Sequence, residues 1–113
     1  MDLILTPEER ALQARARDFS QSVVCPRAAA IDRDEQYPWD IVEALGKTGF
    51  LGMTMPKALG GQDRSLLDAV LVIEEMAKSC TVTARIVVET NMGAISTVMA
   101  YGSEAQKRLA AKL

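Results

Sequence analysis

The sequence predicts an all-α protein, an up-and-down bundle of about five to six helices in one domain spanning residues 1–113. Three observations carry this prediction. Helix-capping signals recur along the chain, apolar residues repeat at helical spacing between them, and strand-like alternation is confined to one stretch. The composition, 49% hydrophobic and 25% charged, is ordinary for a domain with one buried core.

The first helix is predicted from its N-terminal signals. Thr6, Pro7 and Glu9 place an N-cap, a first-turn proline and a capping-box acid at the right spacing. Pro26 interrupts the pattern and opens a second short helix through Ile31, because the amide that proline lacks would be unbonded in a first turn. Before this interruption the apolar stripe of the first helix is Leu12, Ala16, Phe19 and Val23.

The middle of the chain is predicted as helix, loop and helix. A third helix starts at Pro38 and stops at Gly46 and Gly49, and residues 50–64 form a loop that packs against a neighbour. Ser65 caps the next helix. Its charged residues Asp68, Glu75 and Lys78 are expected to point away from its buried face. That face is predicted to consist of Leu66, Ala69, Val70, Ile73 and Ala77.

The segment from Thr81 to Tyr101 carries conflicting signals. Its first half alternates β-branched or apolar residues with polar ones, which favours a strand. It continues for about twenty residues without a turn signal, which is too long for a typical strand. We therefore predict one helix, apolar nearly all round and central in the bundle, whose only formal charges are Arg85 and Glu89. Ser103 then caps a final helix.

The composition also excludes functions. The chain has no histidine, so a Ser-His or Cys-His nucleophile pair cannot form within it. Cys25 and Cys80 lack metal-ligand spacing and are expected to be free thiols. With a net charge of −2 and scattered Lys and Arg, we expect neither nucleic acid nor a membrane surface as a partner. The sequence shows neither a secretory signal pattern nor a membrane span, so we expect a cytoplasmic protein.

Several short motifs together resemble a known family. Tyr37-Pro38-Trp39 is followed by Gly49-Phe50-Leu51-Gly52, Met55-Pro56 and Gly60-Gly61, and Gly102-Ser103-Glu104-Ala105-Gln106-Lys107 comes near the end. In this order and spacing, the motifs resemble the N-terminal helical domain of the flavin-dependent acyl-CoA dehydrogenases, over nearly the whole chain. One departure is Asp63, where many members have glycine.

The resemblance implies a flavoenzyme of fatty acid metabolism that converts an acyl-CoA to a trans-2-enoyl-CoA. A carboxylate base takes the α-proton while the β-hydrogen passes as hydride to FAD. Electrons usually leave to an electron-transfer flavoprotein, and the complete enzyme is a homo-oligomer. The family's catalytic glutamate and most flavin contacts lie in a middle β-domain and a C-terminal α-domain, both absent here. We therefore expect no catalytic residue in this chain, which alone would be inactive and hold no FAD.

The expected contribution of this chain is the acyl-tail end of the substrate pocket. Counted back from Gly102, Glu89 falls where medium-chain members have a pocket-floor glutamate, and an acidic floor suits a short or polar acyl group. In the alternative, Glu89 only pairs with Arg85 one turn away, and Gly93 only permits close helix packing. The predicted acyl-pocket residues, on one helical face, are Ile86, Glu89, Thr90 and Gly93.

Other interpretations remain. Tyr37 and Trp39 could form a stacking platform for the flavin, although packing in the core or at an interface is the preferred interpretation. The same fold also occurs in flavin-dependent monooxygenases and acyl-CoA oxidases, which differ mostly in downstream residues. A non-catalytic helical interaction module is the third possibility, suggested by the apolar loop residues Leu51, Met53 and Met55, which would be exposed without partner domains.

Overall fold

The computed structural model describes residues 4–112, so residues 1–3 and 113 of the predicted 1–113 domain lie outside the described part. The described residues are helical, with turns and loops between the helices and no strand among them, as predicted. The elements are α1 (Pro7–Phe19), the π-helical turn η1 (Ser20–Val24), α2 (Cys25–Asp34), α3 (Trp39–Thr48), the 3-10 turn η2 (Lys57–Leu59), α4 (Leu66–Ala77), α5 (Thr81–Asn91), α6 (Ala94–Tyr101) and α7 (Glu104–Ala110).

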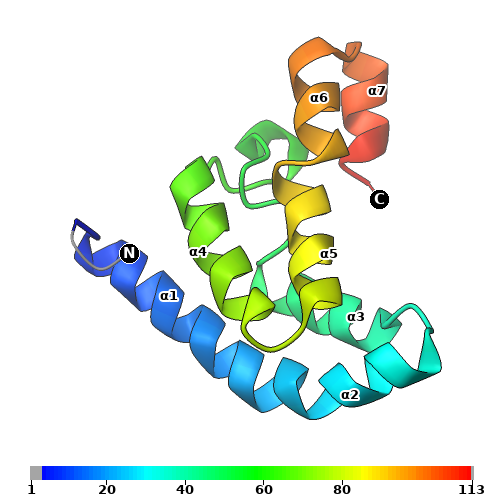
Figure 1. Ribbon diagram of the computed structural model, residues 1–113. Helices are drawn as coiled ribbons and strands as arrows, with labels where there is room; N and C mark the ends of the chain where they lie inside the picture. The colour runs from blue at the N-terminus through cyan, green and yellow to red at the C-terminus, as the bar shows by residue number, and fades with distance from the viewer. Residues whose placement is uncertain (1–3, 113) are drawn as a thin grey trace.

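Figure 1 shows how these helices are arranged. α1 and α2 form one continuous helical run that bends between them, α4 and α5 run antiparallel beside it, and α6 and α7 form a hairpin at the other end of the molecule. α4 packs against both α1 and α5. The core lies around α4, between α1 on one side and α5 on the other, and side chains of η1, α2, α3 and the loop after α3 complete it.

Capping boxes start three of the helices. Thr6 Oγ1 accepts from the amide of Glu9 at 3.2 Å, while Glu9 Oε2 accepts from the amide of Thr6 at 2.7 Å. The same reciprocal pairs begin α4 at Ser65 and α7 at Ser103. α3 passes through Gly46 and ends at Gly49, whose φ of 79° is left-handed. The predicted helix starts are thereby confirmed, because capping depends only on residues close in sequence.

The second helix begins around Pro26 as predicted, but no loop separates it from the first. α1 continues through η1 into α2, and Pro26 lies in the first turn of α2, where its missing amide costs nothing. The amide of Cys25 donates to the carbonyl of Ser20, which is a π-type bond. Because this turn contains one extra residue, the buried stripe passes from Phe19 to Val24, and Val23 is only partly buried.

The predicted buried face of α4 is partly wrong, although Ala69 is buried and Ile73 packs against the core as expected. Leu66 is 60% exposed and Ala77 is exposed, whereas Glu75, expected to point away, is buried with 2% exposure. α4 lies between α1 and α5, so its buried arc is wider than a stripe on one face. The buried residues of α4 are Ala69, Leu71, Val72, Glu75 and Met76.

The predicted helix from Thr81 to Tyr101 is helical but breaks into α5 and α6 at Met92 and Gly93. Two side chains take hydrogen-bonding groups away from a continuous helix. Asn91 Nδ2 donates to the carbonyl of Val87 at 2.9 Å, and Thr54 Oγ1 donates to the carbonyl of Asn91. Because a loop residue occupies that carbonyl, the chain turns and restarts at Ala94.

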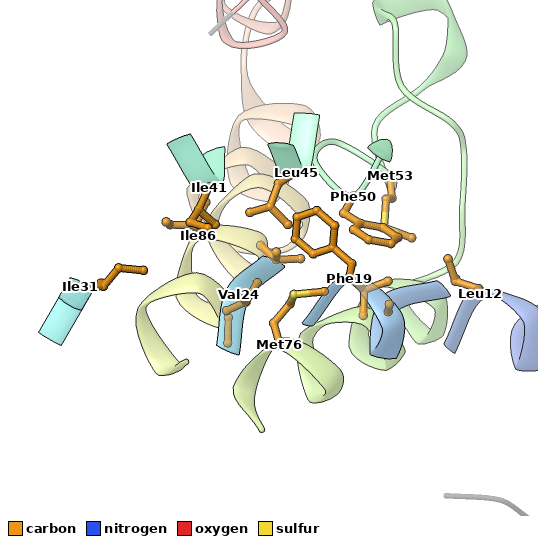
Figure 2. Close-up of a cluster of buried hydrophobic side chains, with 14 residues drawn as sticks. Leu12, Phe19, Val24, Ile31, Ile41, Leu45, Phe50, Met53, Met76 and Ile86 are labelled. Carbon is orange, nitrogen blue, oxygen red and sulfur yellow. The ribbon is translucent and has the colours of Figure 1, made fainter. Parts of the chain in front are cut away.

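Figure 2 shows the side chains of the core. The rings of Phe19 and Phe50 pack edge to face, with centroids 5.7 Å apart. Met53, expected to be exposed without partner domains, is buried instead, while Leu51 and Met55 are partly buried. The loop after α3 therefore packs against the bundle as predicted, which weakens the loop-based support for an interaction module.

Asp63, at a position where many members of the family that the sequence resembles have glycine, lies at the end of this loop. Asp63 has a φ of 50°, in the left-handed region where glycine is at ease and aspartate is tolerated. Its amide donates to the carbonyl of Met55 at 2.9 Å, and Gln62 Nε2 donates to the carbonyl of Gly49 at 2.7 Å. The turn is thus kept with aspartate in place of glycine.

Candidate functional site

A groove of about 440 Å³ runs along α5. One wall consists of α5 residues at steps of four, in two adjacent rows on the same helical face. Tyr37, from the connection between α2 and α3, forms the opposite side. The α5 residues of this wall are Thr81, Val82, Arg85, Ile86, Glu89 and Thr90.

A second hollow of about 560 Å³ adjoins the first at Glu89 and Thr90, which line both. It lies where the end of α5 faces the loop after α3 and the α6–α7 hairpin. Its other lining residues are apolar or glycine: Leu51, Gly52, Met55, Gly60, Ala94, Ile95, Val98, Ala110 and Ala111. Together the two hollows make a mainly apolar surface, with Glu89 and Thr90 at the junction.

The structure brings together three of the four predicted pocket residues. Ile86, Glu89 and Thr90 line the groove, whereas Gly93 lines neither hollow. Gly93 lies at the break between α5 and α6, and a Cβ there would come within 2.3 Å of Glu89 Oε2. Gly93 therefore sits behind Glu89, where its lack of a side chain leaves room for the Glu89 carboxylate.

Glu89 is paired. Arg85 Nε donates to Glu89 Oε1 at 2.5 Å, with the two side chains 74% and 42% exposed. The alternative interpretation, a pair one turn apart, is therefore present within the groove itself. Thr90 Oγ1 donates back to carbonyls of the preceding turn, those of Ile86 and Val87, at 3.2 Å. The groove thus offers a paired cation and anion and the hydroxyls of Thr81 and Thr90 on an otherwise apolar wall.

Sequence reasoning did not place Arg85 or Tyr37 in the site. The signal for Arg85 was available, since Thr81, Arg85 and Glu89 follow one another at steps of four on one helical face. Nothing local in the sequence indicates that Tyr37 reaches α5, because that approach depends on how α2 and α3 pack.

The two aromatic residues around the start of α3, Tyr37 and Trp39, are not in the core. Tyr37 is 53% exposed and Trp39 is 71% exposed, which contradicts the core-packing interpretation. Their rings contact each other at a centroid distance of 4.7 Å and an interplanar angle of 61°. Rings at this angle form no flat platform for stacking, so the pair does not fit a bound flavin.

The second hollow does not fit FAD either. A pyrophosphate bound there would face the Glu89 carboxylate, and no cationic side chain is among its described lining residues. An acyl chain needs only apolar surface, which both hollows provide. The second hollow therefore offers apolar surface but no cationic group for a pyrophosphate.

The described part of the chain yields two further results. Its cysteines, Cys25 and Cys80, are free, as predicted, and it contains no group of carboxylates and thiols placed to hold a metal ion. Between residues 4 and 112, no helix combines the length and apolar character needed to span a bilayer.

Comparison with known proteins identifies relatives of this chain. It is 52% identical over 109 residues to a 3-sulfinopropanoyl-CoA desulfinase of Variovorax paradoxus and 32% identical over 108 residues to a short-chain specific acyl-CoA dehydrogenase of Clostridium acetobutylicum. Each match covers 96% of this chain but only 27% and 28% of the respective relative. The chain therefore spans just over a quarter of these relatives.

A solved structure and a family model match this chain to the same family as these relatives. An acyl-CoA dehydrogenase from Geobacillus kaustophilus superimposes with a TM-score of 0.85 at 21% identity, over 96% of this chain and 30% of that one. The family model for the acyl-CoA dehydrogenase N-terminal domain matches residues 6–110. The chain belongs to the acyl-CoA dehydrogenase family, whose N-terminal α-helical domain it represents.

Proposed function

We propose that this chain is the N-terminal domain of an FAD-dependent enzyme of the acyl-CoA dehydrogenase family and forms the acyl-end wall of its substrate pocket. The observation that carries the proposal is the groove along α5, where Ile86, Glu89 and Thr90 lie together. Its volume of about 440 Å³ is within the range of small-molecule sites. The proposed reaction is α,β-dehydrogenation of an acyl-CoA to a trans-2-enoyl-CoA.

The charges in the groove support a short acyl group with a polar or anionic end. A plain alkyl tail would desolvate Arg85 and Glu89 without giving either a new partner, which is unfavourable. An anionic end can instead accept hydrogen bonds from the Arg85 guanidinium, whose planar donors suit two-oxygen anions. In this arrangement Glu89 holds Arg85 in position when no ligand is bound.

One specific observation favours a second candidate reaction. The relative from Variovorax paradoxus, 52% identical to this chain, is by its name a desulfinase acting on 3-sulfinopropanoyl-CoA. A sulfino group is a short two-oxygen anion, and Arg85 is a cation on the groove wall. Removal of a sulfino group from such an acyl-CoA is therefore the alternative to dehydrogenation for the complete enzyme.

Other components belong to the complete enzyme in this proposal. FAD would be held by the middle β-domain and C-terminal α-domain of the family, since the second hollow of this chain has no cationic side chain in its described lining for the pyrophosphate. An electron-transfer flavoprotein would accept electrons if the reaction is dehydrogenation, and the complete enzyme would form a homo-oligomer. The 113-residue chain would contribute shape and charge to the pocket but no catalytic group.

The test uses both the full-length protein and the 113-residue chain. Each is purified, and its visible spectrum is recorded anaerobically with FAD, with short acyl-CoAs and with 3-sulfinopropanoyl-CoA. A flavin bound only by the longer protein and bleached by an acyl-CoA supports dehydrogenation. Sulfite release from 3-sulfinopropanoyl-CoA without bleaching by other acyl-CoAs supports the second reaction. Flavin bound tightly by the short chain, or neither reaction, contradicts the proposal.

A further inference from the structure

The groove along α5 depends on a single side chain for its second wall. Six of its described lining residues come from α5, and Tyr37 alone comes from elsewhere. The width of the groove near Tyr37 is therefore set by the distance between one aromatic ring and the α5 helix. A residue in this position controls which ligands fit, because no neighbouring wall residue can compensate for its loss.

Tyr37 lies on a braced connection. α2 ends at Glu35, whose φ of 51° turns the chain away from the helix axis. Arg27 of α2 and Asp40 of α3 form an ion pair at 2.8 Å across the connection. The amide of Trp39 donates to the carbonyl of Tyr37 at 2.9 Å. The backbone that carries Tyr37 is thus tied to both neighbouring helices.

The ring of Tyr37 is supported by Trp39. The two rings meet at a centroid distance of 4.7 Å, and Trp39 does not line the groove. An edge-to-face contact of this kind favours one orientation of each ring. Trp39 therefore acts on the groove only through Tyr37, which makes it a positioning residue.

The two hollows form one surface along α5. They meet at Glu89 and Thr90, near the C-terminal end of α5. Near the other end of the groove, residues of α2 line a small hollow together with Thr81 and Val82. In the proposed function, an acyl group that enters from the second hollow would pass Glu89 and run toward the N-terminal half of α5.

We infer that Tyr37 is a specificity-determining residue that limits the length of the acyl group in the groove, with Trp39 holding its ring in place. The inference rests on the proposed function, since it requires an acyl-CoA in this groove. The ring sets the length limit by excluding further methylene groups. The hydroxyl is a separate feature that can donate to a polar tail end.

The experiment measures kcat/KM of the full-length enzyme for straight-chain acyl-CoAs of increasing length. Tyr37→Ala should raise kcat/KM for a longer substrate, relative to a shorter one, by about tenfold or more, the usual discrimination per methylene group in an apolar pocket. Trp39→Ala should change the ratio in the same direction but less. Tyr37→Phe should leave the ratio as in the wild type, since it keeps the ring.

Tyr101→Ala is the matched control, because Tyr101 is 88% exposed and lines a different hollow. It should leave the length profile unchanged. An unchanged profile in Tyr37→Ala, with FAD bound and turnover retained, overturns the inference and leaves the proposed function standing. Lack of reaction of the wild-type enzyme with every acyl-CoA, 3-sulfinopropanoyl-CoA included, overturns both. Tyr37→Leu provides the same measurement if the alanine variant does not fold.

Discussion

Asn91 Oδ1 accepts a hydrogen bond from the backbone amide of Met53 at 2.6 Å. The same side chain donates through Nδ2 to the carbonyl of Phe50 at 3.0 Å, and Asn91 is only 1% exposed. The last turn of α5 and the loop after α3 are therefore joined by a buried and satisfied polar group. This contact fixes Leu51 and Gly52, two lining residues of the second hollow, relative to Glu89.

Removal of the Asn91 amide should destabilise the fold. Asn91→Ala leaves the Met53 amide and the Phe50 carbonyl buried without partners, so the free energy of unfolding should fall by about 2 to 3 kcal/mol. Urea unfolding followed by circular dichroism measures the change. Ser96→Ala, which removes an exposed hydroxyl at the start of α6, should change it by less than about 0.5 kcal/mol. Equal effects of the two substitutions would contradict the role given to Asn91.

The buried carboxylate of Glu75 should make stability depend on acid pH. Burial raises the pKa of Glu75, but hydrogen bonds and charges from Arg17 and Lys78 outweigh it, so the pKa is lowered from its usual 4.5. Because the folded pKa is the lower one, this stabilisation is complete above pH 4.5 and is lost as the pH falls through the folded pKa. The free energy of unfolding should therefore decrease below this pH.

Glu75→Gln tests this pH dependence. At pH 7 the free energy of unfolding of the variant should be lower than that of the wild type by about 1 to 3 kcal/mol. This loss is smaller than for a fully buried ion pair, because Arg17 and Lys78 are about half exposed and solvent screens their charges. The stability of the variant should also fall less steeply in acid, as shown by urea unfolding between pH 3 and 7. Glu43→Gln, which breaks an exposed pair with Lys47, should have a smaller effect at both pH values. If the free energy of unfolding fell equally steeply with decreasing pH in Glu75→Gln and in the wild type, the pH dependence would not come from Glu75.

Gly60 and Gly61 should differ in their tolerance of alanine. A Cβ on Gly61 would lie 2.0 Å from the backbone oxygen of Met55, so the loop must move, and Gly61→Ala should cost about 2 kcal/mol or more. Gly60 has a φ of 88° but open space where a Cβ would lie, so Gly60→Ala should cost only about 1 kcal/mol of backbone strain. Thermal unfolding of both variants measures the two losses of stability. A larger loss for Gly60→Ala than for Gly61→Ala would show that backbone strain outweighs the steric clash.

The charges of the groove should control preference between acyl groups. In the full-length enzyme, Arg85→Met should lower kcat/KM for an acyl-CoA with an anionic end by about tenfold or more relative to a neutral acyl-CoA of equal length. Glu89→Ala should raise this preference, because it frees the Arg85 guanidinium from its partner at 2.5 Å. Steady-state kinetics with matched substrates measures both ratios. No change in either variant would remove Arg85 and Glu89 from the proposed pocket.

Local features were predictable from the sequence. The caps at Thr6, Ser65 and Ser103 need only residues three positions away, so their signals survive whatever the rest of the chain does. The helical state of α5 was predicted against its strand-like alternation, but the argument from length missed the break at Met92 and Gly93. The motifs between Tyr37 and Gly61 likewise indicated the family that the comparisons show.

Only the tertiary structure decided which residues meet across the chain. Glu75 is buried because Arg17, fifty-eight positions earlier, donates to its carboxylate. The break after Asn91 arises because a loop residue, Thr54, bonds its carbonyl. The groove has a second side because packing of α2 and α3 brings Tyr37 to α5. The sequence determined the helices, the family and one wall of the candidate site. Burial, the helix break and the opposite wall depend on contacts between distant segments, which local patterns do not encode.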